Sequence, residues 1–358
     1  MGIEERIKRI EEEMERTQVH KGTERHLGLL KAKLAKLKRD VAARASKGGK
    51  RAGFAVRKTG DATVVMLGLP SVGKSTILNR ITNADSRVAA YEFTTLKTVP
   101  GMMEYRGARI QILDLPGIVE GASRGRGRGK EVIAVARSAD LILIVLDVGN
   151  TAVLSTIRKE LYDMGIRLDS KPPHIVLKKK HTGGINITST VRLSKLDRRT
   201  MLDILNVYEI HNCDILFHED VDADRFIDYL AGNRVYTPSL VVINKTDLKK
   251  EKLDFNFDHL PVSAEKGTNI EKLKEEIYRR LNLIRLFMRH RDGKIDYDEP
   301  MILKQEATIQ TVCNRIHTDM VNEFRYAQVW GPSSKFPGQK VGMTHTLKDG
   351  DVVMIVKK

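Results

Sequence analysis

The sequence predicts an α/β protein whose largest domain is a mostly parallel sheet with helices on both faces. Short, largely apolar and β-branched runs stand at residues 62–67, 108–114, 141–147 and 239–243, and segments with helical periodicity separate them. Such runs are typical of parallel strands that are buried on both faces. The chain of 358 residues has room for further domains, which we expect on both sides of this sheet domain.

The first 60 residues are predicted to form a basic helical domain. Apolar residues recur at spacings of three and four over residues 3–14 and 27–41, which indicates a hairpin of two amphipathic helices. Residues 25–58 contain twelve lysines or arginines and one acid, Asp40, so this stretch carries +11 of the net charge of +16. Such clustering favours contact with RNA phosphates, and the alternative is a solvated helix face.

The composition also bears on the compartment. No run of about 18 apolar residues occurs and the N-terminal segment is charged, so we expect neither a membrane span nor a secretory signal. Cys213 and Cys313 are the only cysteines, and their spacing fits neither a zinc site nor a disulfide framework. We therefore expect a cytoplasmic protein without a membrane partner.

Residues 68–75, Gly-Leu-Pro-Ser-Val-Gly-Lys-Ser, match the phosphate-binding loop of nucleoside triphosphatases. The loop follows a predicted strand and precedes a predicted helix at 76–81, which is the context that the motif requires. Its backbone N–H groups can converge on one anion, and the helix N-terminus adds its dipole. We expect Lys74 to reach the β- and γ-phosphates and Ser75 to bind Mg²⁺. The residues predicted to bind the nucleotide here are Gly68, Ser71, Val72, Gly73, Lys74, Ser75 and Thr76.

Two further segments are predicted to sense the γ-phosphate. Asp114 ends the second predicted strand and is followed by Leu-Pro-Gly, so Asp114 would hold Mg²⁺ and the Gly117 N–H would bind the γ-phosphate. The segment Tyr-Glu-Phe-Thr-Thr-Leu at 91–96 supplies a switch threonine, for which we choose Thr95 with Thr94 as the alternative. The predicted metal ligands are Ser75, Thr95 and Asp114, and the predicted catalytic residues are Lys74, Thr95 and Gly117.

The base is predicted by Asn-Lys-Thr-Asp at 244–247, which follows the last predicted strand of the sheet. The Asp247 carboxylate can accept hydrogen bonds from guanine N1–H and the N2 amine, whereas adenine would leave it unpaired. Asn244 would tie this segment to the phosphate-binding loop. The motifs therefore predict a GTP and GDP site at the carboxyl edge of the sheet and disfavour ATP. The residues predicted to bind the nucleotide outside the phosphate-binding loop are Asp114, Gly117, Asn244, Lys245, Asp247, Ser263 and Ala264.

The distance between the third and fourth predicted strands indicates an inserted subdomain. One strand–helix–strand crossover takes about 30 residues, whereas 99 positions separate Leu141 from Leu240. The predicted boundaries are 1–60 for the helical domain, 61–164 and 237–287 for the GTPase domain, 165–236 for a small α/β insert and 290–358 for a C-terminal domain.

The insert carries a second basic cluster, Lys-Lys-Lys-His at 178–181. We expect this cluster to contact RNA together with the basic residues near the N-terminus. His174 and His181 are interpreted as RNA-contacting or exposed residues. They are not assigned as metal ligands, because no cysteine or carboxylate stands at ligand spacing.

The end of the chain is predicted to form a small α+β domain. The segment 286–298 is interpreted as a polar linker that follows a helix at 270–283. Trp330, the only tryptophan, is assigned to the core and not to base stacking. The predicted elements are strands at 300–303, 326–330 and 351–357 and a helix at 309–317.

Two features near the phosphates bear on turnover. Ile118 follows the Asp-Leu-Pro-Gly segment and cannot hydrogen-bond an attacking water, so we predict slow intrinsic hydrolysis. Ser71 stands where K⁺-activated relatives carry asparagine, which leaves K⁺ activation open.

Alternating arginine and glycine at 124–130 disfavour a stable helix. This stretch is either a basic arm that orders on RNA or on a partner, or a surface loop.

These motifs resemble those of the Obg group of translation-factor-class GTPases. Further stretches are similar to the developmentally regulated GTP-binding proteins, and the resemblance covers nearly the whole chain. These stretches are Val-Ile-Ala-Val-Ala-Arg at 132–137, Gly-Gly-Ile at 183–185, Val-Trp-Gly at 329–331 and Val-Gly-Met-Thr-His-Thr at 341–346. The resemblance implies a ribosomal-protein-like insert, a C-terminal TGS domain of β-grasp fold and association with translating ribosomes. The compact length leads us to expect an archaeal source.

Our interpretation is a Mg²⁺-dependent GTPase that switches between GTP- and GDP-bound states on ribosomes, through basic residues 25–58 and 178–181. The alternative is a nucleotide-gated RNA-binding or scaffold protein in which hydrolysis is incidental. We expect a monomer and allow for a protein partner that stabilises the chain.

Overall fold

The computed structural model describes residues 2–18, 20, 22–47, 59–82, 99–115, 129–248, 255–290, 292–317 and 319–358. The chain divides into two compact units. Unit 1 contains Met1–Gly53 and Gly165–Tyr236, and unit 2 contains Phe54–Met164 and Thr237–Lys358. None of the described helices is long and apolar enough to span a membrane.

Unit 2 contains the predicted α/β sheet, which has six strands in the order β11-β10-β4-β1-β3-β2. All neighbouring strands are parallel except β2, which pairs antiparallel with β3. The fold-class prediction is therefore confirmed, although the sequence did not reveal β2. The strands are β1 (Ala62–Leu67), β2 (Val99–Tyr105), β3 (Ala108–Asp114), β4 (Leu141–Asp147), β10 (Ser239–Asn244) and β11 (Leu260–Pro261).

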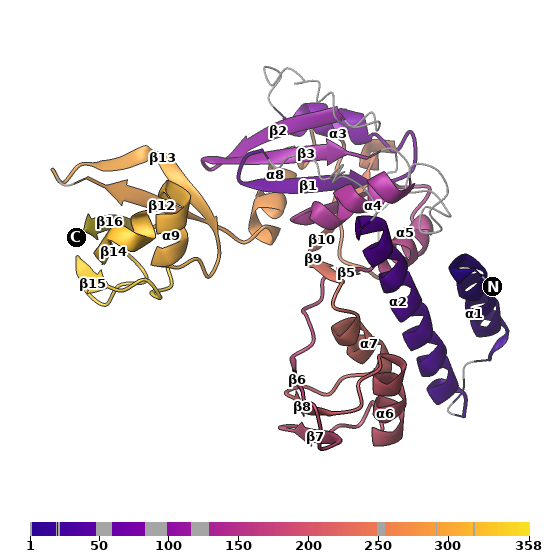
Figure 1. Cartoon of the computed structure of the whole chain (residues 1–358). Coiled ribbons are helices and arrows are strands. Elements are labelled where there is room, and N and C mark those ends of the chain that lie inside the picture. Colours follow the sequence, from indigo (N-terminus) through magenta and orange to yellow (C-terminus); the bar gives the residue numbers. More distant parts are fainter. Residues whose placement is uncertain are drawn as a thin grey trace. The chain divides into compact units, whose positions relative to one another are not determined.

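Helices cover both faces of this sheet (Figure 1). Val64 and Met66 of β1 pack in one cluster with Ile77 of α3 and Leu273 of α8. Helices α4 and α5 also contact the sheet, at β1 and β4. The alternate residue Val65 is fully buried as well, as expected for a strand covered on both sides. The helices are α3 (Lys74–Ile81), α4 (Gly129–Ser138), α5 (Val153–Asp163) and α8 (Ile270–Arg280).

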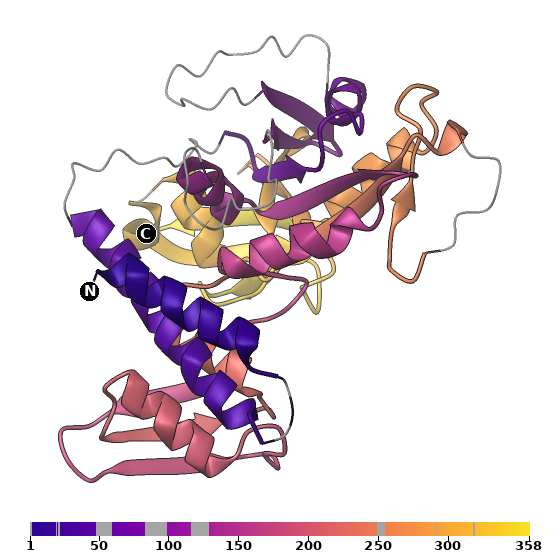
Figure 2. The same cartoon turned by 90° about the vertical axis from the view of Figure 1, so that its right-hand side faces the viewer.

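Unit 1 combines the helical hairpin with the insert. Its longest helix, α2, runs beside α1 in both views (Figures 1 and 2). Ala32 and Ala35 of α2 share one buried cluster with Phe217 and Phe226 of the insert. The sequence suggested two separate domains, whereas these segments share one core. The elements are α1 (Ile3–Arg16), α2 (Glu24–Lys47), β5 (Ile166–Leu168), β6 (Ile175–Lys179), β7 (Ile185–Ser189), α6 (Arg198–Val207), β8 (Cys213–Phe217), α7 (Ala223–Ala231) and β9 (Val235–Thr237).

The insert is built on a three-stranded sheet with the order β6-β8-β7. Its central strand, β8, was not predicted. Helices α6 and α7 begin at the N-caps Asp197 and Asp222, whose carboxylates accept hydrogen bonds from the backbone N–H groups of Thr200 at 2.9 Å and Arg225 at 2.8 Å.

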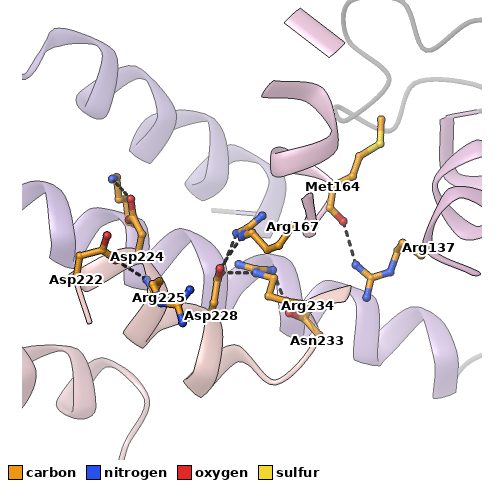
Figure 3. A network of polar contacts seen from close by, with 10 residues as sticks. Arg137, Met164, Arg167, Asp222, Asp224, Arg225, Asp228, Asn233 and Arg234 are labelled. Carbon is orange, nitrogen blue, oxygen red and sulfur yellow. Dashed lines mark hydrogen bonds and ion pairs between the residues drawn. The ribbon is translucent and has the colours of Figure 1, made fainter. Parts of the chain in front are cut away.

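A buried ion cluster joins the two ends of the insert (Figure 3). Arg167 of β5 donates two hydrogen bonds to Asp228 of α7, at 2.5 and 2.8 Å, and Arg234, just before β9, donates a third at 2.7 Å. The side chains of Arg167 and Asp228 are only 9% and 6% exposed. Removing the carboxylate would leave one buried and one partly buried guanidinium group without their counter-charge.

The end of unit 2 forms a five-stranded sheet with the order β13-β12-β16-β14-β15. Helix α9 covers one face, where Ile309 and Val312 pack against Leu286 and Val353. The linker interpretation of 286–298 is therefore wrong. The preceding helix ends at Arg280, and Leu286 is fully buried in the next strand. The elements are β12 (Leu283–Arg289), β13 (Ile295–Lys304), α9 (Ile309–Ile316), α10 (Met320–Glu323), β14 (Phe324–Trp330), β15 (Gln339–Val341) and β16 (Val352–Lys357).

Trp330 does not lie in the core of this domain. It is half-buried at the end of β14, and the Arg289 guanidinium lies over its ring at 4.4 Å from the centroid. The core prediction for this residue is wrong, because its neighbour Val329 takes the inward position and strand side chains alternate between faces.

Candidate nucleotide-binding site

The sheet register brings the predicted motifs to one edge. Met66 pairs with Asp114, so β1 and β3 end side by side, and Leu67 pairs with Ile144 of β4, which continues for three more residues. Asn244 of β10 pairs with the last residue of β4. Because these strands are parallel, the segments that follow them lie at the same carboxyl edge.

The phosphate-binding loop depends on two close backbone approaches. A Cβ atom at Gly68 would lie 2.2 Å from the carbonyl oxygen of Val145. A Cβ at Gly73, where φ is +91°, would lie 2.3 Å from the Asn244 side chain. Neither position therefore accepts a larger residue without movement of its neighbours. Lys74 begins α3 and donates hydrogen bonds to the carbonyls of Gly68 and Leu69, at 3.1 and 2.9 Å.

Asn244 joins the phosphate-binding loop to the loop after β11. Its side-chain amide donates to the Val72 carbonyl at 2.9 Å, and its carbonyl accepts from the Ala264 N–H at 3.0 Å. Asn244 is only 2% exposed, so both bonds are shielded from water. Lys245 adds a second link by donating to the Ser71 carbonyl at 2.7 Å. The loops on both sides of the predicted base are thus held by the same dipeptide.

Asp247 is oriented by Ser263, a role that the sequence did not reveal. The Ser263 hydroxyl donates to the Asp247 carboxylate at 2.6 Å, and this hydrogen bond holds the pKa of Asp247 below its ordinary value. The Ser263 hydroxyl also accepts from the Lys266 N–H at 3.2 Å. The carboxylate is therefore ionised at neutral pH and fixed in direction, as a hydrogen-bond acceptor for a base requires.

Arg80 is a further residue that sequence reasoning missed. It stands on α3 and donates to the carbonyls of Ala264 and Glu265 at 3.0 and 2.7 Å. These bonds tie the helix that follows the phosphate-binding loop to the loop near Ser263. No local motif reveals such a contact, because the partners are 184 and 185 residues apart.

Lys74 and Asp114 form the charged centre of the site. Burial raises the pKa of Asp114, and the nearby Lys74 and a hydrogen bond from Ser75 oppose this shift. Burial likewise lowers the pKa of Lys74, opposed by Asp114. Desolvation thus outweighs the attraction between the two groups. One Asp114 oxygen, Oδ1, is buried and has no hydrogen-bond partner within the described part of the chain.

An unpaired buried carboxylate oxygen beside a serine hydroxyl fits a divalent cation with oxygen ligands. Mg²⁺ prefers such ligands together with phosphate oxygens and waters. Ser75 and Thr76 are exposed at the start of α3, where a nucleotide phosphate could reach them. Thr94, Thr95, Gly117, Ile118 and residues 124–128 lie outside the described residues.

Five basic residues of α2 are engaged in ion pairs within unit 1. Lys31 pairs with Asp224 at 2.8 Å and Lys36 with Glu209 at 2.6 Å, both on the insert. Three further cations also pair, namely Arg25 with Asp203, Lys38 with Glu11 and Arg39 with Asp40. These pairs reduce the net charge that this part of α2 offers to a polyanion.

The second basic cluster lies on β6, at one edge of the insert's sheet. Lys178 and Lys179 are exposed, and strand alternation sends neighbouring side chains to opposite faces. His174 is exposed and stacks on His218 with ring centroids 4.3 Å apart. Within the described segments, no group of three or more His, Cys, Asp or Glu side chains could hold a metal ion.

Comparison with family models covers most of the chain. A 50S ribosome-binding GTPase model matches residues 63–179, a model of the C-terminal region of the same domain matches 182–283, and a TGS domain model matches 284–357. The TGS match begins within one residue of the start of β12.

Full-length relatives are also similar. An uncharacterized GTP-binding protein of Methanocaldococcus jannaschii is 52% identical over 100% of this chain and 94% of its own length. Developmentally-regulated GTP-binding protein 1 of Xenopus laevis is 49% identical over the whole of both chains. Developmentally-regulated G-protein 3 of Arabidopsis thaliana is 48% identical over 99% of both. These relatives include archaeal and eukaryotic proteins, so an archaeal source stays a prediction.

Among solved structures, the YchF GTPase of Schizosaccharomyces pombe superposes with a TM-score of 0.45 at 15% identity, covering 84% of this chain and 99% of that one. The family assignment rests on the relatives found by sequence similarity and not on this superposition. With a P-loop GTPase domain and a C-terminal TGS domain, the chain belongs to the developmentally regulated family of GTP-binding proteins.

Proposed function

We propose that the chain hydrolyses GTP to GDP and phosphate with Mg²⁺ and uses this reaction as a slow switch on ribosomes. The observation that carries the proposal is the buried Asn244 side chain, which holds the phosphate-binding loop and the loop near Ala264 in one arrangement. Two motifs far apart in the sequence are thereby fixed around one position for a nucleotide. Such preorganisation is what a phosphoryl-transfer site needs, because its catalysis depends on positioning and electrostatics.

Guanine selectivity is assigned to Asp247. Its carboxylate is ionised and is oriented by the hydrogen bond from Ser263. Guanine offers two donors to this carboxylate, whereas adenine would leave it without a partner, at the cost of an unpaired charge. Ser263 and Ala264 are assigned to the base-binding loop, with Lys245 beside the base.

The phosphates are assigned to the loop at Gly68–Ser75 and to Lys74. When GTP binds, the Lys74 ammonium exchanges its two backbone carbonyl partners for phosphate oxygens, which carry full charge. Ser75 and Asp114 would hold Mg²⁺, which would neutralise charge that develops on the phosphates. The unpaired Oδ1 of Asp114 supports this assignment.

The switch is assigned to Thr95 and Gly117, on either side of the γ-phosphate. Ile118 supplies no hydrogen bond for the attacking water, so we expect slow turnover until a partner or a cation orients that water. Ser71 stands where K⁺-activated relatives carry an asparagine side chain, so K⁺ activation stays open. Equal hydrolysis rates in K⁺ and Na⁺ would exclude K⁺ activation.

The ribosome is proposed as the partner because the chain carries a net charge of +16 and matches the 50S ribosome-binding GTPase model. Since five α2 cations pair within unit 1, we assign the RNA contact to Lys33, to the basic residues between positions 44 and 58, and to residues 178–181. Within the last cluster Lys180 pairs with Asp214, so Lys178 and Lys179 are its main contacts. We further propose that the protein acts as a monomer in the cytoplasm and that a protein partner stabilises it.

Phosphate release by Lys74→Ala tests the enzyme assignment. We expect this variant to lose hydrolysis and to bind GTP more weakly, because the cation nearest the phosphates is gone. Removal of Mg²⁺ with EDTA should have the same effect on the wild type. Lys272→Ala, an exposed cation on α8, serves as the control and should hydrolyse GTP normally. A wild-type rate in Lys74→Ala would contradict the assignment.

Co-sedimentation with ribosomes tests the partner assignment. The variant Lys47→Glu, Lys50→Glu, Arg51→Glu should bind ribosomes more weakly, and the loss should be greatest at low salt. A charge-matched control, with the exposed residues Arg158, Lys159 and Lys272 changed to glutamate, should sediment as the wild type does. Equal loss in both variants would point to net charge alone and contradict the assigned contact.

A further inference from the structure

The five-stranded sheet of the TGS domain has one covered face and one open face. Leu286, Val329 and Val353 are fully buried on the inner face, in the cluster that includes α9. The residues that alternate with them along each strand therefore point to the outer face. None of the described helices contributes to the cluster from that face. Figure 1 shows α9 on one side of β12, β16 and β14.

Aromatic side chains gather on this outer face. Phe287 and Trp330 both pair with Val352, one from each neighbouring strand, so they flank the same residue. The ring of Tyr297 lies 5.1 Å from that of Phe287 and is 61% exposed. Tyr326 stands on β14 four positions before Trp330, and therefore on the same face. Tyr297 is exposed and the other three are half-buried, so all four rings keep part of their surface accessible to a ligand.

Two cations lie directly on these rings. The Arg289 guanidinium is 4.4 Å from the centroid of Trp330, and the Lys340 ammonium is 4.8 Å from that of Tyr326. Neither cation forms an ion pair with any residue that the structure describes. The face thus presents flat π-surfaces and unneutralised positive charge within a few ångströms of each other.

We propose that this outer face binds single-stranded RNA by stacking unpaired bases on Trp330, Tyr326 and Phe287. Arg289 and Lys340 cover the rings of Trp330 and Tyr326 in the free protein, so each cation exchanges its ring for a phosphate when a base stacks. The acidic residues Asp298 and Glu299 are exposed on β13, at the edge of the sheet, so the RNA lies over β16, β14 and β15. This inference rests on the proposed ribosomal role and names the RNA class that this domain takes.

The sole tryptophan makes the site directly measurable. Trp330 emission in the full-length protein reports this face alone, since the chain has no other tryptophan. Titration with a 12-nucleotide unstructured oligoribonucleotide should quench the emission, because stacking brings a base onto the indole. A duplex RNA of the same length should quench far less, since its bases are already stacked.

Variants test which residues carry the binding. Fluorescence anisotropy of the labelled oligoribonucleotide should show Trp330→Leu and Arg289→Ala binding between about 5-fold and 150-fold more weakly than the wild type, the range for loss of one stacked base. The controls are Tyr162→Leu and Arg158→Ala, an exposed aromatic and an exposed cation on α5, and both should bind normally. An unchanged circular dichroism spectrum and unfolding temperature show that each variant is folded, in the C-terminal domain as well as in the GTPase domain.

The outcomes separate this inference from the ribosomal role. If single-stranded RNA leaves Trp330 emission unchanged while the wild type still co-sediments with ribosomes, the stacking inference is wrong and the ribosomal role stands. A change in emission caused by ribosomal protein but not by RNA would identify a protein as the occupant and overturn the inference. Loss of affinity in Trp330→Leu together with normal binding by both controls would support it.

Discussion

Replacing Asn244 with alanine removes the side chain that joins the phosphate-binding loop to the loop after β11. In the wild type its amide donates to the Val72 carbonyl at 2.9 Å and its carbonyl accepts from the Ala264 N–H at 3.0 Å. All three residues are buried, with exposures of 2% or less. The alanine variant would leave one backbone acceptor and one backbone donor without a partner in the interior.

The expected loss of nucleotide affinity follows from the free-energy cost of leaving those two backbone groups unpaired. An unsatisfied buried polar group costs about 1–3 kcal/mol, so the two together cost about 2–6 kcal/mol, nearer the lower value if a water enters the space. If GTP binding requires the loops in their present arrangement, the affinity falls by the same free energy. At about 1.4 kcal/mol per tenfold change, the expected loss is roughly 30-fold to 20,000-fold, nearer the lower value if a water enters the space.

Fluorescent GDP titration and thermal unfolding of the full-length protein measure this effect. We expect Asn244→Ala to bind GDP more weakly and to show a smaller nucleotide-induced rise in unfolding temperature. Asn150→Ala is the matched control, because Asn150 is exposed and donates only to Asp147, at 3.1 Å. An Asn244→Ala variant with wild-type affinity and stability would refute the reasoning.

Three further substitutions test other parts of the account. Asp247→Asn should shift the base preference from guanine toward xanthine, measured by competition of GDP and XDP against labelled GDP, because an amide can donate where the carboxylate only accepts. Asp228→Asn should destabilise unit 1 by about 3–5 kcal/mol in urea unfolding, since it weakens the buried pairing with Arg167 and Arg234. Asp197→Ala should cost about 1 kcal/mol at pH 7 through loss of the α6 N-cap. Because hydrogen bonds in the folded state lower the pKa of Asp197 below 3.8, that difference should be full above pH 3.8 and shrink as the pH falls further.

Each of these predictions has an outcome that would contradict it. Unchanged guanine preference in Asp247→Asn would mean that the base site is misplaced. The exposed pair of Asp224 with Lys31 offers a control for the buried cluster, and Asp224→Asn should cost less than about 1 kcal/mol. Equal costs at the two aspartates would refute the role given to burial. A difference between wild type and Asp197→Ala that does not change with pH would exclude the carboxylate as the cap.

The sequence predicted the parts of the site that lie within short segments. The phosphate-binding loop and the Asn-Lys-Thr-Asp segment each carry their chemistry in a few consecutive residues, and the parallel strands that precede them place both at one edge. The sequence predicted Ser263 as a nucleotide-binding residue but not its hydrogen bond to Asp247. It gave no indication that Arg80 belongs to the site. Their partners are distant in the chain, and only the fold brings them together.

The errors have a similar physical origin. The apolar spacing of α2 was recognised, but composition did not reveal that acids on the insert, up to 193 residues away, would face its cations. The strand β12 follows a helix after only two residues and mixes arginine with apolar side chains, so it gave no clear alternation. Trp330 was assigned by its hydrophobicity, whereas its position on β14 sends it to the outer face.

Single-turnover GTP hydrolysis by the full-length protein, with and without ribosomes, tests the central claim most directly. The account predicts slow hydrolysis by the protein alone, because Ile118 cannot orient the attacking water, and a large increase when ribosomes are added. The Lys74→Ala variant should hydrolyse GTP neither alone nor with ribosomes. An unchanged slow rate with ribosomes present would contradict a ribosome-triggered switch and would favour a nucleotide-gated binding protein.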